Sequence, residues 1–263
     1  MYTPANAPQS IGAILDSGFK LFTSSIKQVL PITYLGAVLG GLWSWGFQSL
    51  MFDQTLTAGQ LNIDWPFLTG AYVLMIVISS IFMAAALLRI RAASMAEPMS
   101  FGGALQGGVR RAPAVIGVSI LYMLAFMIGL VLLVVPGVYL SVMLAFAFYA
   151  AAGDGMGPID SARYSYGLVK GYWWRTAGLL TVIFIIAMVI YFAVGLAAGL
   201  IAVSQQAAGT LEPSILAEVV ITPLFTSVAA AMMYCLAYAA YHDLKLRREG
   251  TDLAERIGNL TEA

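Results

Sequence analysis

No charged residue interrupts "PAVIGVSILYMLAFMIGLVLLVVPGVYLSVMLAFAFYAAAG", residues 113–153, and this stretch decides the fold. A helix needs roughly 20 apolar residues to cross the hydrocarbon core of a bilayer, so the stretch is long enough for two crossings. Pro136 and Gly137 lie between its two halves, and a Pro-Gly pair is a turn signal. We therefore predict two spans, 113–135 and 138–153. The second is short, and whether it fully crosses the bilayer stays open.

Four further apolar runs flank this stretch, and the whole chain has the composition of a membrane protein. Hydrophobic residues make up 60% of the 263 residues and charged residues only 10%, far from the balance of a soluble globular domain. The runs cover residues 29–52, 65–88, 174–203 and 217–241. We predict an all-α polytopic membrane protein, a single domain over 1–263 with six transmembrane helices. The formal net charge is zero, so we expect no nucleic-acid partner.

The placement of basic residues predicts the orientation in the membrane. All 13 Lys and Arg residues lie before span one, between spans two and three, between spans four and five, or after span six. Basic residues concentrate in cytoplasmic loops. This pattern places both termini in the cytoplasm, with residues 242–263 as a cytoplasmic tail.

An amphipathic stretch precedes each odd-numbered span. Apolar residues fall at helical spacing within 11–26, 101–112 and 159–173, with Ser10 and Ser100 as candidate N-caps of the first two. "SIGAIL" at 10–15 also resembles "SFGGAL" at 100–105. We predict three amphipathic helices at the cytoplasmic side, facing anionic headgroups, in three repeated helix-hairpin units. The alternative is that these stretches only connect the spans.

The C-terminal segment "YHDLKLRREGTDLAERIG", residues 241–258, holds the only histidine. Asp243 with Arg247, and Lys245 with Glu249, lie four residues apart, as helix-supporting ion pairs do. Gly250 is expected to end this helix, and Thr251 to begin a short second one. The segment is either a solvated helix end with basic anchors or a docking surface. In the second case Arg247 and Arg248 meet a phosphate headgroup or the stretch 159–173.

The candidate site residues are basic or polar and are expected at the cytoplasmic side. Those expected to contact lipid or a partner are Arg110, Arg111, Arg163, Lys170, Arg175, His242, Asp243, Arg247 and Arg248. The residues expected to shape the backbone are Pro136, Gly137 and Gly250, together with Pro223, which should kink span six.

Catalytic and cofactor signatures are thin. One histidine and one cysteine, Cys235, provide neither a multi-histidine site nor a thiol pair for metal, so we expect no metal, no cofactor and no enzymatic activity. No ionisable residue falls near the centre of a span, which argues against a proton-coupled transporter. Hydroxyls within the spans either line a passive lipid pathway or bond to their own helix carbonyls, and we favour the second. They are Ser79, Ser80, Ser119, Ser141, Thr181, Thr226 and Ser227.

Three motifs resemble one bacterial family. They are "VVPGVYLSVMLAFAFYA" at 134–150, "DSARYSYGLVKGYWWRTAG" at 160–178 and "YHDLKLRREGTDL" at 241–253. The chain resembles the six-helix membrane proteins named for the membrane domain of glycerophosphoryl diester phosphodiesterase. The resemblance implies a stand-alone module in the bacterial cytoplasmic membrane. The hydrolytic activity in the family name belongs to a separate soluble domain, and this sequence contains no counterpart.

Three functions follow as hypotheses. The first is a non-enzymatic membrane module that binds lipid, including anionic headgroups, or a protein partner, alone or as an oligomer. The second is a transporter or channel for an apolar or lipid-like substrate. The third, an interfacial lipid phosphodiesterase, rests only on the family name and on the adjacent pair His242 and Asp243.

Overall fold

The computed structural model describes residues 4–53, 65–97, 99–132, 134–207 and 215–261, and the side chains of most of these. The described residues form helices, with no β-strand among them. In chain order the elements are α1 (Ile11–Asp53), α2 (Trp65–Ser94), α3 (Phe101–Leu132), α4 (Val134–Leu144), α5 (Ala147–Tyr149), the π-helical turn η2 (Ala150–Asp154), α6 (Pro158–Val169), α7 (Trp173–Ala207), the π-helical turn η3 (Ala217–Ile221) and α8 (Thr222–Thr261).

Six helical segments in the described part of the chain are long and apolar enough to cross a membrane. They are Ile11–Leu50, Trp65–Ser94, Phe101–Val131, Val135–Asp154, Trp173–Ile201 and Ala217–Arg248. Each contains or largely overlaps one of the six predicted spans. The predictions of an all-α chain and of six candidate spans are confirmed, and the chain is a multi-pass membrane protein.

Two of the three predicted amphipathic stretches continue directly into the following span. Residues 11–26 form the first part of α1, and residues 101–112 form the first part of α3. The predicted caps are confirmed: Ser10 Oγ accepts the Ala13 N–H at 3.3 Å, and Ser100 Oγ accepts the Gly103 N–H at 3.0 Å. Ile14 is fully buried, so part of the apolar face of the first stretch packs on protein. Only the third stretch forms a separate helix, α6.

The predicted turn at Pro136 and Gly137 is wrong, because both residues lie in the first turn of α4. Proline is tolerated there, since the first N–H groups of a helix have no acceptor within it. Gly137 instead serves packing. A Cβ added to Gly129 of α3 would lie 2.3 Å from the Gly137 Cα, so α3 and α4 touch backbone to backbone.

The predicted end of the last helix at Gly250 is also wrong. Helix α8 continues through Gly250 and Thr251 to Thr261. A glycine within a helix costs only about 1 kcal/mol relative to alanine. The flanking Arg247, Arg248, Glu249 and Leu253 favour helix and outweigh that cost. Pro223 lies in the first turn of α8, directly after the π-helical turn η3. Proline has no backbone N–H, and the wider π-helical turn accommodates the hydrogen bond that is missing there.

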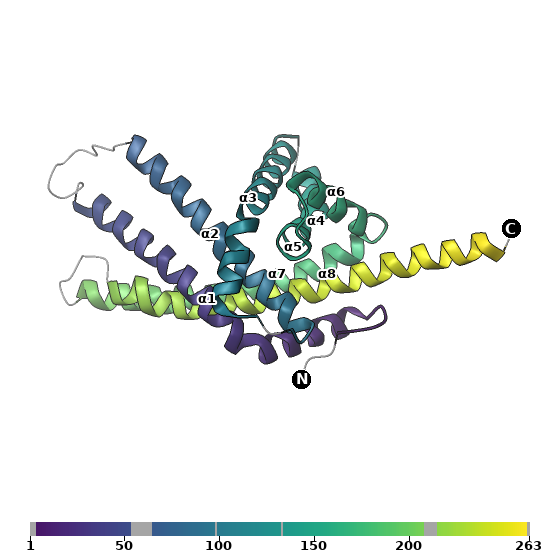
Figure 1. Cartoon of the computed structure of the whole chain (residues 1–263). Helices are drawn as coiled ribbons and strands as arrows, with labels where there is room; N and C mark the ends of the chain where they lie inside the picture. Colours follow the sequence, from purple (N-terminus) through teal and green to yellow (C-terminus); the bar gives the residue numbers. More distant parts are fainter. Residues whose placement is uncertain (1–3, 54–64, 98, 133, 208–214, 262–263) are drawn as a thin grey trace.

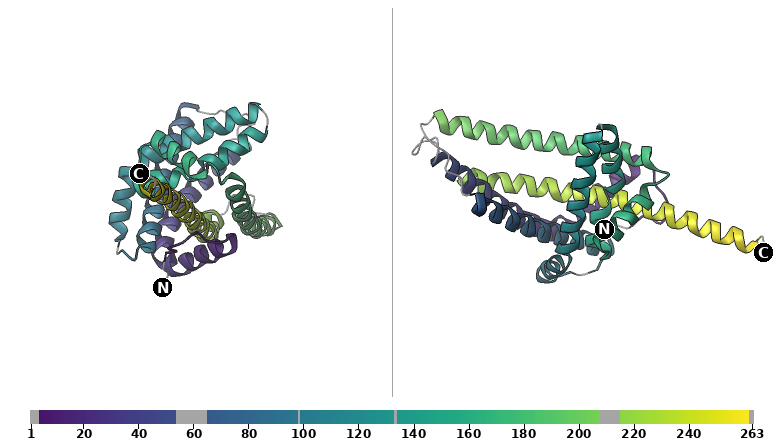
Figure 2. Two further views of the ribbon diagram at one scale, coloured as in Figure 1. Left: turned by 90° about the vertical axis from the view of Figure 1, so that its right-hand side faces the viewer. Right: turned by 90° about the horizontal axis from the view of Figure 1, so that it is seen from above.

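The three hairpins diverge from a common base. Figure 1 shows α1 and α2, and α7 and α8, extending to the left, while the α3–α4 hairpin points in another direction. Figure 2 shows α8 continuing past the base on the opposite side, toward the C-terminus. The base contains α5, η2 and α6 and much of the buried core, including Phe146, Leu168 and Leu236. The polar side chains described next are held at this base.

Candidate functional site at the charged end of α8

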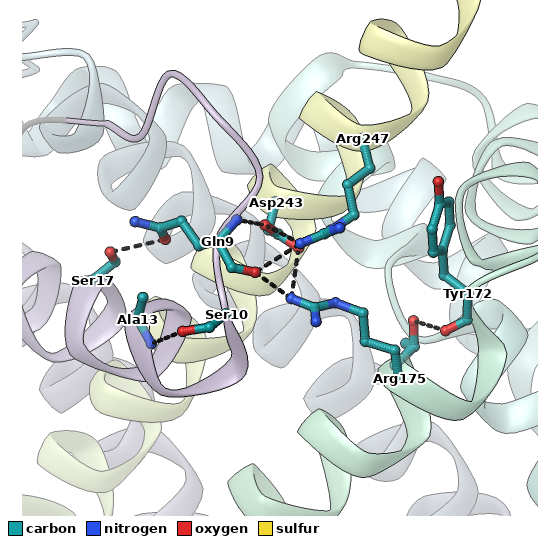
Figure 3. A network of polar contacts seen from close by, with 9 residues as sticks. Gln9, Ser10, Ala13, Ser17, Tyr172, Arg175, Asp243 and Arg247 are labelled. Atoms are coloured by element: carbon teal, nitrogen blue, oxygen red, sulfur yellow. Dashed lines mark hydrogen bonds and ion pairs between the residues drawn. The ribbon is translucent and has the colours of Figure 1, made fainter.

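Asp243 is the centre of a buried polar network, the Asp243 hub, which joins the two ends of the chain (Figure 3). Its side chain is only 3% exposed. Asp243 Oδ1 accepts the Gln9 N–H at 2.6 Å, and Oδ2 accepts Arg247 Nε at 2.8 Å. Arg175, in the first turn of α7, lies 3.5 Å from the same oxygen. The predicted Asp243–Arg247 pair is confirmed.

The two arginines of the hub also bind the backbone of the N-terminal segment. Arg247 Nη2 donates to the Gln9 carbonyl at 2.7 Å, and Arg175 donates to the same oxygen. The Gln9 side chain in turn accepts the Ser17 hydroxyl at 3.1 Å. The segment before α1 is therefore held by charge-assisted bonds to its backbone, which are about twice as strong as neutral ones.

A second network, the Asp154 cluster, uses Tyr241 and Lys245 of α8, which each lie two residues from Asp243 and therefore on another face of the helix. The Tyr241 hydroxyl donates to Asp154 Oδ2 at 2.5 Å. Lys245 and Arg91 approach the same carboxylate at 3.7 and 3.8 Å. Asp154 ends η2, so this cluster ties α2 and α8 to the short elements at the base.

Arginines cap the carbonyl end of η2. Arg111 of α3 donates to the Gly153 carbonyl at 2.8 Å and to the Ala152 carbonyl, and Arg91 of α2 also donates to Gly153. The next residue, Gly155, has φ +76°, the left-handed conformation that glycine adopts readily after a helix. The last carbonyls of a helix have no hydrogen-bond donors within the helix, and here two cationic side chains donate to them.

Ser165 of α6 bridges the break between α4 and α5. Its hydroxyl donates to the Met143 carbonyl at 2.7 Å and accepts the Phe146 N–H at 3.2 Å. The residue is fully buried. One side chain thus satisfies two backbone groups that the interrupted helix leaves unpaired, and fixes α6 against the base.

A groove of about 460 Å³ lies between α6 and α8. The Tyr164 ring packs edge-on to Tyr241 at 6.4 Å between centroids, which holds α6 beside α8. Arg163 and Arg248 both line the groove, together with Asp160. Arg163 and Asp160 lie 4.0 Å apart and are largely exposed, so their charges remain accessible.

Six of the nine predicted site residues lie in three places. Arg175, Asp243 and Arg247 meet in the Asp243 hub, Arg111 caps η2, and Arg163 and Arg248 share the groove. Arg110 and Lys170 are exposed and line neither cavity that the structure describes. His242 is half-buried on α8, while the oxygens of its neighbour Asp243 are bonded to the hub.

Several residues with polar contacts between distant segments were not predicted as site residues. They are Gln9, Arg89, Arg91, Asp154, Tyr241 and Lys245. Arg89 is buried and donates to the Met99 and Gln28 carbonyls. Asp154 carried a usable signal, because it is the first charge after a long apolar run. Gln9 carried none, since its backbone makes the decisive contacts.

The chemistry available at this site is ionic and hydrogen-bonding. Among the described residues, no group of three or more His, Cys, Asp or Glu side chains could hold a metal ion. The predicted pair of Lys245 with Glu249 lies partly outside the described side chains. The arrangement supplies several guanidinium groups and one ammonium group around two carboxylates, a composition suited to anion binding.

The fold and these networks define a polytopic α-helical membrane protein with a charged end built around its last helix. The model of the family described as a domain of unknown function, DUF7847, matches residues 65–244, well over half of the chain. The chain belongs to this family. The matched region includes Asp154, Arg175 and Asp243 but not Gln9 or Arg247. Neither the curated proteins nor the solved structures contain a match.

Proposed function

We propose that the chain is a non-enzymatic membrane module that binds the phosphate headgroup of anionic lipid in the groove between α6 and α8. The groove carries this proposal, because it brings Arg163 and Arg248 together from two helices. Guanidinium groups bind phosphate oxygens through paired hydrogen bonds. Asp160 offsets one positive charge and leaves an excess of one.

The surroundings of the groove support an anionic ligand. The Asp243 hub has two arginines against one carboxylate. The Asp154 cluster, with the arginine that caps η2, has Arg91, Arg111 and Lys245 against one carboxylate. Positive charge therefore exceeds negative charge in all three places. Met156, which is half-buried, also lines the groove and offers apolar contact to the first methylene groups of a lipid.

The same charge excess supports an orientation with both termini in the cytoplasm of a bacterium. The proposal includes α6 as an amphipathic helix at the headgroup level, with Ser165 and Leu168 buried and Arg163 exposed. The three repeated units and the kinship with the membrane domain of glycerophosphoryl diester phosphodiesterase belong to the same proposal. Reporter fusions at both termini would test the orientation, and external labelling of either terminus would contradict it.

Lipid binding is tested with the purified protein in nanodiscs. The double variant Arg163→Ala/Arg248→Ala should lower the affinity for phosphatidylglycerol at least tenfold, as measured by native mass spectrometry of retained lipid. The control Arg110→Ala/Lys170→Ala removes the same charge outside the groove and should retain that affinity. If both variants lost affinity equally, the effect would come from net charge alone and not from the groove. If neither variant lost affinity, the groove would be rejected as the binding site. Co-purification of a protein that competes with phosphatidylglycerol would favour a protein partner instead.

A further inference from the structure

A second cavity lies within the apolar part of the molecule, far along α8 from its charged end. It has a volume of about 230 Å³ and lies among α1, α2, α7 and α8. Six hydroxyl-bearing residues line it, one each from α1, α2 and α7 and three from α8: Thr33, Ser79, Tyr191, Thr226, Ser227 and Tyr234. All of them belong to segments long and apolar enough to span the membrane. No charged side chain is among its lining residues.

Five of these six hydroxyls divide into two kinds. Thr33, Thr226 and Ser227 donate to carbonyls of their own helices, at 3.2, 2.9 and 2.9 Å. A hydroxyl that donates once can still accept hydrogen bonds. Within the described part of the chain, the Tyr191 and Tyr234 hydroxyls make no hydrogen bond. The wall therefore offers acceptors from the first kind, and both donors and acceptors from the two phenols.

Close contacts beside the cavity fix its shape. A Cβ added to Gly36 would lie 2.9 Å from the Phe82 Cβ, so α1 and α2 touch next to it. A Cβ added to Gly41 would lie 2.2 Å from the Glu218 carbonyl oxygen, so α1 also touches η3. At both points α1 already packs closely on its neighbour, which leaves little room for the helices to move closer together.

The exposure of its lining residues shows where the cavity opens. Ser79 of α2 is exposed, and Tyr191 of α7 is 44% exposed. Both lie within membrane-spanning segments, so this side faces lipid hydrocarbon. A molecule that enters here comes from the bilayer, and its apolar part can stay there while a small polar group fills the cavity.

We propose that this cavity binds an uncharged lipid through its hydroxyl group, with diacylglycerol as the representative class. Such a hydroxyl donates to the lone pairs of Thr33, Thr226 or Ser227 and accepts from Tyr191 or Tyr234. The absence of charge from the lining excludes a phosphate headgroup, since burying an anion without a countercharge is strongly unfavourable. The volume is several times the roughly 30 Å³ of one water molecule, enough for a small polar group without its acyl chains.

Photocrosslinking provides the test. A diacylglycerol with a diazirine near its glycerol group is added to the full chain in phosphatidylcholine nanodiscs. Saturable labelling is expected on α1, α2, α7 or α8 at residues that line the cavity. Unlabelled diacylglycerol should compete, and phosphatidylglycerol should not. If labelling did not saturate, or if phosphatidylcholine competed as well as unlabelled diacylglycerol, the probe would be marking only the lipid that surrounds the protein. Either result would overturn the proposal.

Two variants separate the ligand from the fold. Tyr191→Phe/Tyr234→Phe removes two hydroxyls without changing shape and should weaken labelling about tenfold, while Tyr72→Phe, an exposed tyrosine outside the cavity, should not. Ala37→Phe fills the cavity and should abolish labelling, while Ala197→Phe adds the same ring on the exposed face of α7 and should not. Equal effects within either pair would reject the site. The groove variant Arg163→Ala/Arg248→Ala should label normally, which keeps this result independent of the proposed function.

Discussion

The start of α8 and its charged end use their polar groups differently. At the start, Thr226 and Ser227 donate to carbonyls one turn back on the same helix. Toward the charged end, Tyr241 and Asp243 bond to residues 87 and 234 positions away in the chain. The start of α8 therefore satisfies these hydroxyls within the helix, and α1 meets the neighbouring turn η3 through the small residue Gly41. Toward the charged end, side chains themselves join distant segments. Four substitutions test this contrast.

The largest effect is expected from Asp243→Ala, which removes the carboxylate and leaves Arg175 and Arg247 without their countercharge. Breaking a buried ion pair from one side costs about 3–5 kcal/mol. The midpoint of thermal unfolding in detergent should fall sharply, and the segment before α1 should become sensitive to protease. Asp160→Ala, at an exposed carboxylate, is the matched control. If both variants had the same midpoint of thermal unfolding, the hub would contribute no more to stability than an exposed ion pair does.

Ser165→Ala should have the next largest effect, because it leaves the Met143 carbonyl and the Phe146 N–H unpaired in the interior. An unsatisfied buried group costs about 1–3 kcal/mol. The loss should show in denaturant or heat unfolding. Thr181→Ala removes a hydroxyl that bonds to its own helix on an exposed face and should change stability little. A similar loss at Thr181 would contradict the contrast between local and long-range hydroxyls.

Gly41→Ala tests whether small residues hold the apolar segment together. The new methyl group would meet the Glu218 carbonyl oxygen, so the backbone of α1 or η3 must move. Overpacking of this kind costs about 1–3 kcal/mol. Gly40→Ala is the control, since nothing lies within 4 Å of a Cβ there. The same unfolding midpoint for both variants would count against a backbone contact at Gly41.

Gly250→Ala should have the smallest effect, and of the opposite sign. The helix passes through this position, and a Cβ there meets nothing within 4 Å. Alanine should therefore stabilise the local helix by about 1 kcal/mol or less. Amide hydrogen exchange of residues 246–256 should slow. Faster exchange would show that glycine ends the helix after all.

Hydrophobicity was sufficient to predict the six candidate spans, because crossing a membrane requires a long apolar run whatever its neighbours are. Local turn chemistry was less informative. Pro136 and Gly250 each carry a signal for a break, but proline fits the first turn of a helix and a single glycine fits inside one. Whether such a residue ends a helix or lies within one depends on the residues around it and on how they pack.

The candidate site was predicted in part, and the reason lies in which atoms make the contacts. Asp243 and Arg247 could be paired by their helical spacing, which needs no tertiary information. The partners from other segments, Gln9 and Arg175, could not, because their approach follows from how α7 and the N-terminal segment pack at the base. For Gln9 the decisive atoms belong to the backbone, which every residue type except proline presents alike.

The hub also has a consequence for the order of assembly. The Gln9 N–H bonds to a carboxylate 234 residues later, on the last helix of the described chain. Chains are made from the N-terminus, and early segments fold before later ones exist. The segment before α1 therefore waits, without its partners, until Asp243 and Arg247 have left the ribosome. The hub therefore closes only after this part of α8 has been made, and a protein truncated before Asp243 would expose an unbound N-terminal segment to quality-control proteases.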